Sequence, residues 1–195
     1  MQIAEKPPYS KIKLTKRASS LSVYIPPFGF HPSLLLVMGF ATFWNGFLLV
    51  WTSMAARVRF PGNLAAMAFS IPFWGIGLFL VFALLFCLYG QTYLHIDNQV
   101  VDYVKTLFGQ RVSRQKPIEK RYIHRLTFIP KHFYQDSDGD RQEKPATLLI
   151  GEGVRLVRLG GVRGGIEHEA EVYWLASEIS EWLDISLETI IHNHD

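Results

Sequence analysis

The fold is decided by LLLVMGFATFWNGFLLVWTSM, residues 34–54, and by LAAMAFSIPFWGIGLFLVFALLFCL, residues 64–88. Both runs lie in longer stretches, residues 18–56 and 60–96, that contain no Asp, Glu, Lys or Arg. A helix needs about 20 apolar residues to cross the hydrocarbon core of a bilayer, whereas core helices of soluble proteins are shorter and more interrupted. The two runs therefore predict a hairpin of two transmembrane helices, with spans at about 34–54 and 64–88.

The remaining residues predict three regions around this hairpin. Residues 1–31 form a basic N-terminal arm, residues 32–90 contain the two-helix hairpin, and residues 91–195 are expected to form a soluble domain. Within the arm, Leu21, Val23 and Ile25 alternate with polar residues, which predicts a strand at 20–25. Since two spans place both flanks on one side of the membrane, we expect this strand to pair with an edge of the soluble domain's sheet.

The distribution of Lys and Arg predicts the orientation of the hairpin. The loop between the spans has Arg57 and Arg59, whereas the arm has five basic residues, namely Lys6, Lys11, Lys13, Lys16 and Arg17. Because basic residues near a span favour the cytoplasmic side, we expect a multi-pass membrane protein with both termini in the cytoplasm. From Asp97 onward there are 13 basic and 16 acidic residues, which argues against a nucleic-acid partner.

Beyond Gly90 the pattern changes to short strands followed by one helix. Alternation and turn residues predict strands at 92–96, 100–108, 110–116, 121–129, 146–150 and 154–159. An amphipathic helix is then indicated by the spacing of Val172, Leu175, Ile179, Trp182 and Leu183. This order is typical of an α+β domain, so we expect a small antiparallel sheet or barrel capped by the C-terminal helix.

Three segments resemble a cyanobacterial two-span membrane protein family of unassigned role. They are SVYIPPFGFHPSLLLVMGFATFWN, FSIPFWGIGLFLVFALLFCLYGQTYLHID and AEVYWLASEISEWLDI. The order of spans, strands and a Trp-bearing last helix also resembles membrane-anchored bacterial pleckstrin-homology-like proteins. Its layout is similar to the photosystem I assembly factor of plastids and cyanobacteria. The resemblance implies a pleckstrin-homology-like C-terminal domain, a thylakoid or plasma membrane of a photosynthetic cell, and a role in assembly, and it supplies no catalytic residue.

The densest run of positive charge lies between residues 111 and 131, where Glu119 is the one acidic residue. A surface that binds anionic headgroups or an acidic partner is one interpretation, and an ordinary solvated hairpin is the other. The candidate binding residues are Arg111, Arg114, Lys116, Lys120, Arg121 and Arg125, followed by Lys131. The C-terminal segment has the opposite sign, and its acidic residues could meet a basic partner, including this chain's own basic run.

Other candidate sites are weak. Asp136, Asp138 and Asp140 resemble the start of a calcium loop, but Arg141 and Thr147 stand where an EF-hand has Gly and Glu. A polar hairpin tip is therefore favoured, with a weak calcium contact as the alternative. The glycines at 160–165 lack the GxGxxG spacing of a phosphate loop, and the histidines share no metal-ligand spacing. We predict no metal, no cofactor and no catalytic residue.

Asn45 is the polar residue near the middle of the first span. An amide in hydrocarbon needs a partner, so we expect an interhelical hydrogen bond to Ser70 or to a backbone carbonyl near Pro72, with a functional site as the alternative. For the whole chain, the sequence favours a non-catalytic membrane-anchored scaffold or assembly factor that binds a membrane protein complex or lipid headgroups. The alternative is a membrane enzyme or sensor with a site between the soluble domain and the bilayer.

Overall fold

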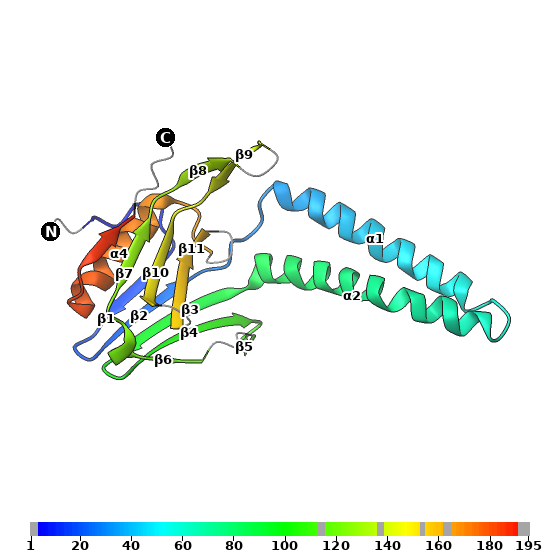
Figure 1. The fold of residues 1–195 in the computed structure, drawn as a ribbon, viewed down its shortest axis with the longest axis horizontal. Coiled ribbons are helices and arrows are strands. Elements are labelled where there is room, and N and C mark those ends of the chain that lie inside the picture. The colour runs from blue at the N-terminus through cyan, green and yellow to red at the C-terminus, as the bar shows by residue number, and fades with distance from the viewer. Residues whose placement is uncertain (1–3, 113–115, 136–138, 153–154, 162–164, 191–195) are drawn as a thin grey trace. The chain divides into compact units, whose positions relative to one another are not determined.

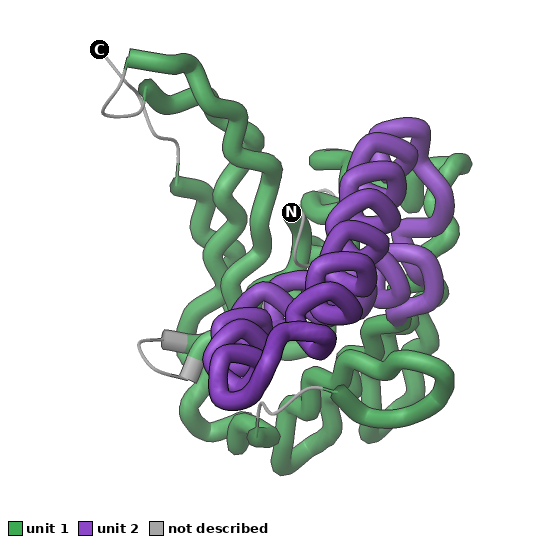
Figure 2. The backbone as a smooth tube through the Cα atoms, turned by 90° about the vertical axis from the view of Figure 1, so that its right-hand side faces the viewer, with its two compact units in different colours: residues 1–26, 91–195 green, residues 27–90 purple. Residues whose placement is uncertain are grey.

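The computed structural model describes residues 4–112, 116–135, 139–152, 155–161 and 165–190. The chain divides into two compact units, which Figure 2 shows in different colours. One unit consists of residues 27–90. The other joins residues 1–26 to residues 91–195, so the N-terminal arm belongs to the same unit as the C-terminal domain.

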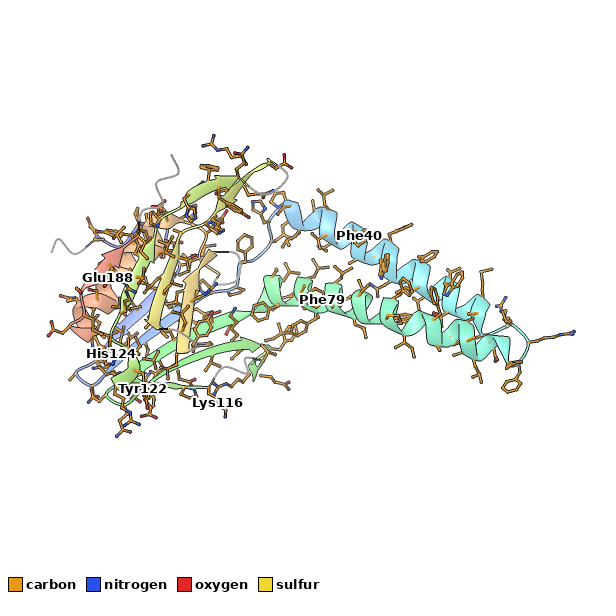
Figure 3. The ribbon with its side chains drawn as sticks, in the orientation of Figure 1. Phe40, Phe79, Lys116, Tyr122, His124 and Glu188 are labelled. Carbon is orange, nitrogen blue, oxygen red and sulfur yellow. The ribbon has the colours of Figure 1, made fainter. Side chains whose placement is uncertain are left out.

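The unit formed by residues 27–90 is a pair of long apolar helices, α1 (Ser33–Ala55) and α2 (Gly62–Tyr89). At about 1.5 Å per residue, each exceeds the roughly 30 Å of a bilayer's hydrocarbon core. Large apolar side chains on both helices are exposed, among them Phe40 at 52% and Phe79 at 67% (Figure 3). A soluble protein would bury such surfaces, so the two predicted membrane-spanning helices are confirmed in length and composition.

Polar side chains join α1 to α2 along the hairpin. Asn45 Nδ2 donates to the Ala41 carbonyl in its own helix at 2.8 Å and to the Gly77 carbonyl of α2 at 3.4 Å. Trp74 Nε1 donates to Thr52 Oγ1 at 3.0 Å. The expected contact between Asn45 and Ser70 is corrected, because Ser70 Oγ donates to the Ala66 carbonyl one turn earlier in α2. The amide of Asn45 thus finds its interhelical partner in the backbone of α2.

The second unit begins with a six-stranded sheet in the described part of the chain, sheet A. Its order is β1-β2-β3-β4-β5, and β6 also pairs with β4. The strands are β1 (Lys13–Lys16), β2 (Ser20–Ile25), β3 (Gln91–Asp97), β4 (Val100–Leu107), β5 (Gln110–Arg111) and β6 (Ile118–Glu119). All of these pairings are antiparallel. The turn between β3 and β4 is closed by Asp97 Oδ1, which accepts hydrogen bonds from the backbone N–H groups of Gln99 and Val100.

Sheet A contains the predicted contribution from the arm. Strand β2 pairs with β3 in a continuous register that runs from Ser20 opposite Asp97 to Ile25 opposite Thr92, as Figure 1 shows by their side-by-side course. The expectation that residues 20–25 join the sheet of the C-terminal domain is therefore confirmed. Strand β1 extends the arrangement by one further strand, so β2 lies inside the sheet rather than at its edge.

The second sheet, sheet B, has the order β11-β10-β7-β12. Its strands are β7 (Leu126–Ile129), β10 (Thr147–Glu152), β11 (Arg155–Gly160) and β12 (Leu187–Thr189). The hairpin of β10 and β11 is confirmed as predicted, and β12 pairs with β7 in parallel. A separate hairpin consists of β8 (His132–Gln135) and β9 (Arg141–Lys144), which flank the acidic turn.

One hydrophobic core joins both sheets and the C-terminal helix, α4 (Glu169–Leu183). Leu21, Ile96, Leu126 and Leu159 from the two sheets are fully buried in it. Helix α4 packs against strands of sheet B with the predicted stripe inward, because Val172, Leu175, Ile179 and Leu183 are buried and Trp182 is half-buried. The fold of a helical hairpin and an antiparallel-rich sheet domain is thus confirmed, with two open sheets rather than a closed barrel among the described residues.

Two predicted strands need correction. The strand expected at 110–116 is limited to Gln110–Arg111 among the described residues, and the strand expected at 121–129 begins only at Leu126. The intervening chain forms β6 and a short 3₁₀ helix, η1 (Lys120–Tyr122). The alternation of apolar and polar residues does not predict the bounds of this strand, because the consecutive residues Leu126, Thr127 and Phe128 are all buried. Strands β1 and β12 were missed because they are short and polar.

The core residue Tyr103 on β4 makes the domain sensitive to alkali. Burial raises the pKa of Tyr103 to about 12 from its ordinary value of 10.0, and the hydrogen bond with Thr92 opposes the rise. Between about pH 10 and pH 12, the Tyr103 hydroxyl is therefore protonated in the folded chain and largely deprotonated in the unfolded chain. We expect the free energy of unfolding to fall by about 2 to 3 kcal/mol as the pH rises from about 10 to about 12.

This pH dependence can be measured by urea unfolding at a series of alkaline pH values, with tyrosinate absorbance as a second signal. Tyr103→Phe is the control, because phenylalanine fills the same space without a titrating hydroxyl. In this variant the free energy of unfolding should fall much less between about pH 10 and pH 12 than in the wild type. A decline of equal size in both proteins would assign the effect to other groups.

Candidate functional site

The register of sheet A separates the basic residues that the sequence places together. Arg111 lies opposite Thr106, whereas Glu119 lies opposite Val100, so these two parts of the run meet opposite ends of β4. At about 3.4 Å per residue, the ends are roughly 20 Å apart. The described candidate residues consequently form two groups, one beside the turn between β4 and β5 and one around η1.

Three of the five candidate residues that the structure describes have acidic partners within the domain. Arg111 pairs with Asp102 of β4 at 2.9 Å, and Arg121 pairs with Glu119 at 2.7 Å. Arg125 Nε lies 2.6 Å from Glu188 Oε2 on β12, so one C-terminal acid does meet the basic run as the sequence suggested. Arg114 lies outside the described residues.

Two lysines of the group differ from these arginines. The amine of Lys120 lies 4.8 Å from the centre of the Trp182 ring, which joins η1 to α4 through a cation–π contact. Lys116 is exposed, and no described acidic residue forms an ion pair with it. Figure 3 shows Lys116, Tyr122 and His124 along one border of the sheet domain, with Glu188 further along. We name this border, residues 116–125, the basic border.

The acidic face of α4 is occupied by the arm. Lys16 Nζ on β1 lies 2.6 Å from Glu178 Oε2 and 2.5 Å from Glu181 Oε2. Trp174 Nε1 donates to the other oxygen of Glu178 at 3.1 Å. Partial burial lowers the pKa of Lys16, but its hydrogen bonds to the two carboxylates outweigh this and raise the pKa above 10.5. Sequence reasoning missed this contact because its partners are far apart along the chain.

We expect Lys16→Ala to lower the free energy of unfolding by about 1 kcal/mol, since exposed ion pairs contribute little individually. Lys13→Ala is the matched control, because Lys13 is exposed on the same strand and should change stability by less than about 0.5 kcal/mol. Urea unfolding measures both, and added salt should reduce their difference. The contribution of the charge should persist until the pH rises through the raised pKa, above 10.5. Equal losses for the two variants would contradict the bridging role of Lys16.

The remaining sequence candidates are only partly described. Asp136, Asp138, His192 and His194 lie outside the described residues. Within the described ranges, no group of three or more His, Cys, Asp and Glu side chains could hold a metal ion. The flanking hairpin of β8 and β9 instead combines cations with aromatic rings: Arg141 lies 4.5 Å from the centre of the Phe133 ring, and Lys144 lies 4.3 Å from that of Tyr134.

Comparison with known proteins adds no assignment. No protein family model matches this chain, and no curated protein matches it. The function is therefore argued from the residues and their arrangement.

Proposed function

We propose that this protein is a non-catalytic membrane-anchored scaffold or assembly factor, whose sheet domain binds a membrane protein complex or lipid headgroups at the bilayer surface. The observation that carries the proposal is the insertion of two apolar helices between the paired strands β2 and β3. Only Gly90 separates α2 from β3. A domain joined to the membrane at two adjacent points has restricted rotation, which suits a protein that presents one face to a partner.

The finer description of the domain is also a proposal. Two sheets around one core, with a helix after the last long strand of sheet B, support a pleckstrin-homology-like reading. The partner expected from the resemblance is a complex of a photosynthetic membrane. That partner stays a prediction, and it rests on the three quoted segments alone.

We further propose that both termini lie in the cytoplasm, because the arm carries more Lys and Arg than the loop with Arg57 and Arg59. Reporter fusions after residue 61 and after residue 195 measure this orientation. A cytoplasmic reporter should be active at 195 and inactive at 61. The reverse pattern would contradict the proposed orientation, but it would still agree with two membrane spans.

The binding surface can be tested with the full chain purified in mild detergent from its native membranes. Replacing Arg114, Lys116 and Arg121 by Gln removes three positive charges from the run of residues 111–131. We expect proteins or anionic lipids that co-purify with the wild type to be lost from this variant, and to be lost from the wild type when salt is raised.

The matched control replaces Lys11, Lys13 and Arg17 by Gln, three exposed cations of the arm. This variant has the same net charge as the first and should keep the co-purifying partners. If both variants retain the same proteins and lipids as the wild type at low salt, the three replaced charges of the run do not bind a partner.

A further inference from the structure

The turn between β4 and β5 places a large apolar side chain where the backbone disfavours it. Leu107 pairs with Gln110, so the loop consists of Phe108 and Gly109 alone. Both have positive φ, 50° for Phe108 and 78° for Gly109. Two-residue hairpin loops of this kind strongly favour Asn-Gly or Asp-Gly, because a side chain such as phenylalanine is strained at positive φ. Phe108 is 66% exposed, so most of its apolar surface is accessible from outside the domain.

The register of sheet A fixes the position of this turn relative to the chain's entry into the sheet. Gln91, the first residue of β3, lies opposite Thr106 of β4. Because β4 runs antiparallel to β3, it continues beyond Gln91 on the side from which the chain enters β3. Phe108 is two residues past Thr106 and therefore lies roughly 7 Å beyond Gln91 along the strand direction. The headgroup region of a bilayer is roughly 5 to 8 Å deep on each side. Gln91 follows Tyr89, the last residue of α2, by two positions, so the turn lies at the end of the sheet where the chain enters from α2.

The outer face of sheet A at this end is aromatic. Tyr24 lies opposite Tyr93, with ring centres 5.1 Å apart, and Tyr93 lies opposite Val104. Tyr93 is 41% exposed, and its hydroxyl donates to Gln91 Oε1 at 2.8 Å. Tyrosine is enriched at membrane interfaces, because its ring contacts lipid while its hydroxyl stays hydrated. Lys105 and Arg111 flank the turn on its two strands, and the ion pair of Arg111 with Asp102 offsets part of the positive charge at this end.

We propose that the turn at Phe108 and Gly109 inserts into the interfacial layer of the bilayer, as a third point of attachment beside the two spans. The phenylalanine ring enters the boundary between headgroups and acyl chains. The amine of Lys105 lies at the level of the lipid phosphates. This inference rests on the proposed membrane anchorage, and it deepens the proposed function by stating which end of the sheet faces the lipid.

The test uses the full chain in vesicles of phosphatidylcholine and phosphatidylglycerol that contain a nitroxide-labelled lipid. Cys87→Ala removes the single cysteine, and a fluorophore is attached at Gln110→Cys beside the turn. Two further sites are compared: Phe79→Cys in α2 and Asn98→Cys in the turn at the opposite end of β4. The nitroxide lipid should quench the labels at 79 and 110, and it should leave the label at 98 unquenched.

Phe108→Asn is then added to the chain labelled at 110. Asparagine suits positive φ, so the urea midpoint should hold or rise while quenching at 110 falls several-fold. That combination excludes misfolding as the cause. The proposal is overturned if the label at 110 is as weakly quenched as that at 98, or if Phe108→Asn leaves quenching unchanged. If the label at 79 also escapes quenching, the anchorage fails with it, and so does the proposed function.

Discussion

A chain in which Gly-Ser-Gly replaces residues 27–90 should fold as a soluble monomer, whereas residues 91–195 alone should not fold. The replacement is short enough because Ile25 and Thr92 are already opposite each other in adjacent strands, and hairpin loops commonly have two to five residues. It keeps the whole unit of residues 1–26 and 91–195. The shorter chain lacks β1 and β2, and with them part of the core.

The expected loss is large compared with the stability of a domain. Leu21, Val23 and Ile25 are at most 1% exposed. Burying such side chains contributes about 1.5 to 3 kcal/mol each, so losing three removes roughly 5 to 9 kcal/mol. Natural domains have a total stability of about 5 to 15 kcal/mol. The shorter chain also exposes β3 as an unpaired edge, which favours aggregation.

Circular dichroism, urea unfolding and size-exclusion chromatography distinguish the two chains. The joined chain should give one cooperative transition and a monomer peak. Amide exchange should show protection of β3 in the joined chain and its loss in the shorter one. If residues 91–195 alone are as stable and as protected from amide exchange as the joined chain, the arm does not contribute to the stability of the sheet.

Gly160→Ala should lower the free energy of unfolding by roughly 3 to 4 kcal/mol. Gly160 ends β11 with φ +92°, and a Cβ atom there would lie 2.6 Å from the carbonyl oxygen of Ala146. It would also lie 3.1 Å from Cγ2 of Val172 on α4. The variant therefore combines an unfavourable backbone conformation with a collision between sheet B and the helix that covers it.

Gly109→Ala is the matched control in the same joined chain. Gly109 also has positive φ, +78°, but no atom lies within 4 Å of the position of its Cβ. Gly109→Ala should lower the free energy of unfolding only through its unfavourable backbone conformation, by about 1 kcal/mol. Urea unfolding gives the difference between the two variants. Losses of equal size would show that the backbone of β11 does not approach β10 and α4 as closely as described.

The features predicted from the sequence depend on local periodicity. The two apolar runs, the alternation of Leu21, Val23 and Ile25, and the helical stripe of α4 each need only a window of neighbouring residues. Strands β1 and β12 carry no such signal, because KLTK and LET are short and mostly exposed. They form because β2 and β7 offer free backbone groups to pair with, which is a property of the assembled sheets.

The candidate site also depends on contacts between residues that are far apart in the sequence, which local periodicity does not predict. Charges that are close in sequence, such as Arg111 and Arg121, are separated because the pairing of β4 directs them to different ends of the sheet. Their partners are distant in sequence, as Arg125 and Glu188 show. A charge run indicates that a surface is basic, but register and long-range ion pairs decide how much of that charge is available to a partner.

The insertion of the helices between β2 and β3 also sets an order of events during synthesis. Strand β2 leaves the ribosome before the two helices, yet it acquires its neighbour β3 only after both helices have been made. Closing so long a loop by diffusion is entropically costly, but a hairpin threaded into the bilayer returns its two ends to the same side. On the proposed membrane topology, insertion of the hairpin would therefore help to complete the sheet, and a nascent chain that fails to insert would keep β2 as an exposed, aggregation-prone strand.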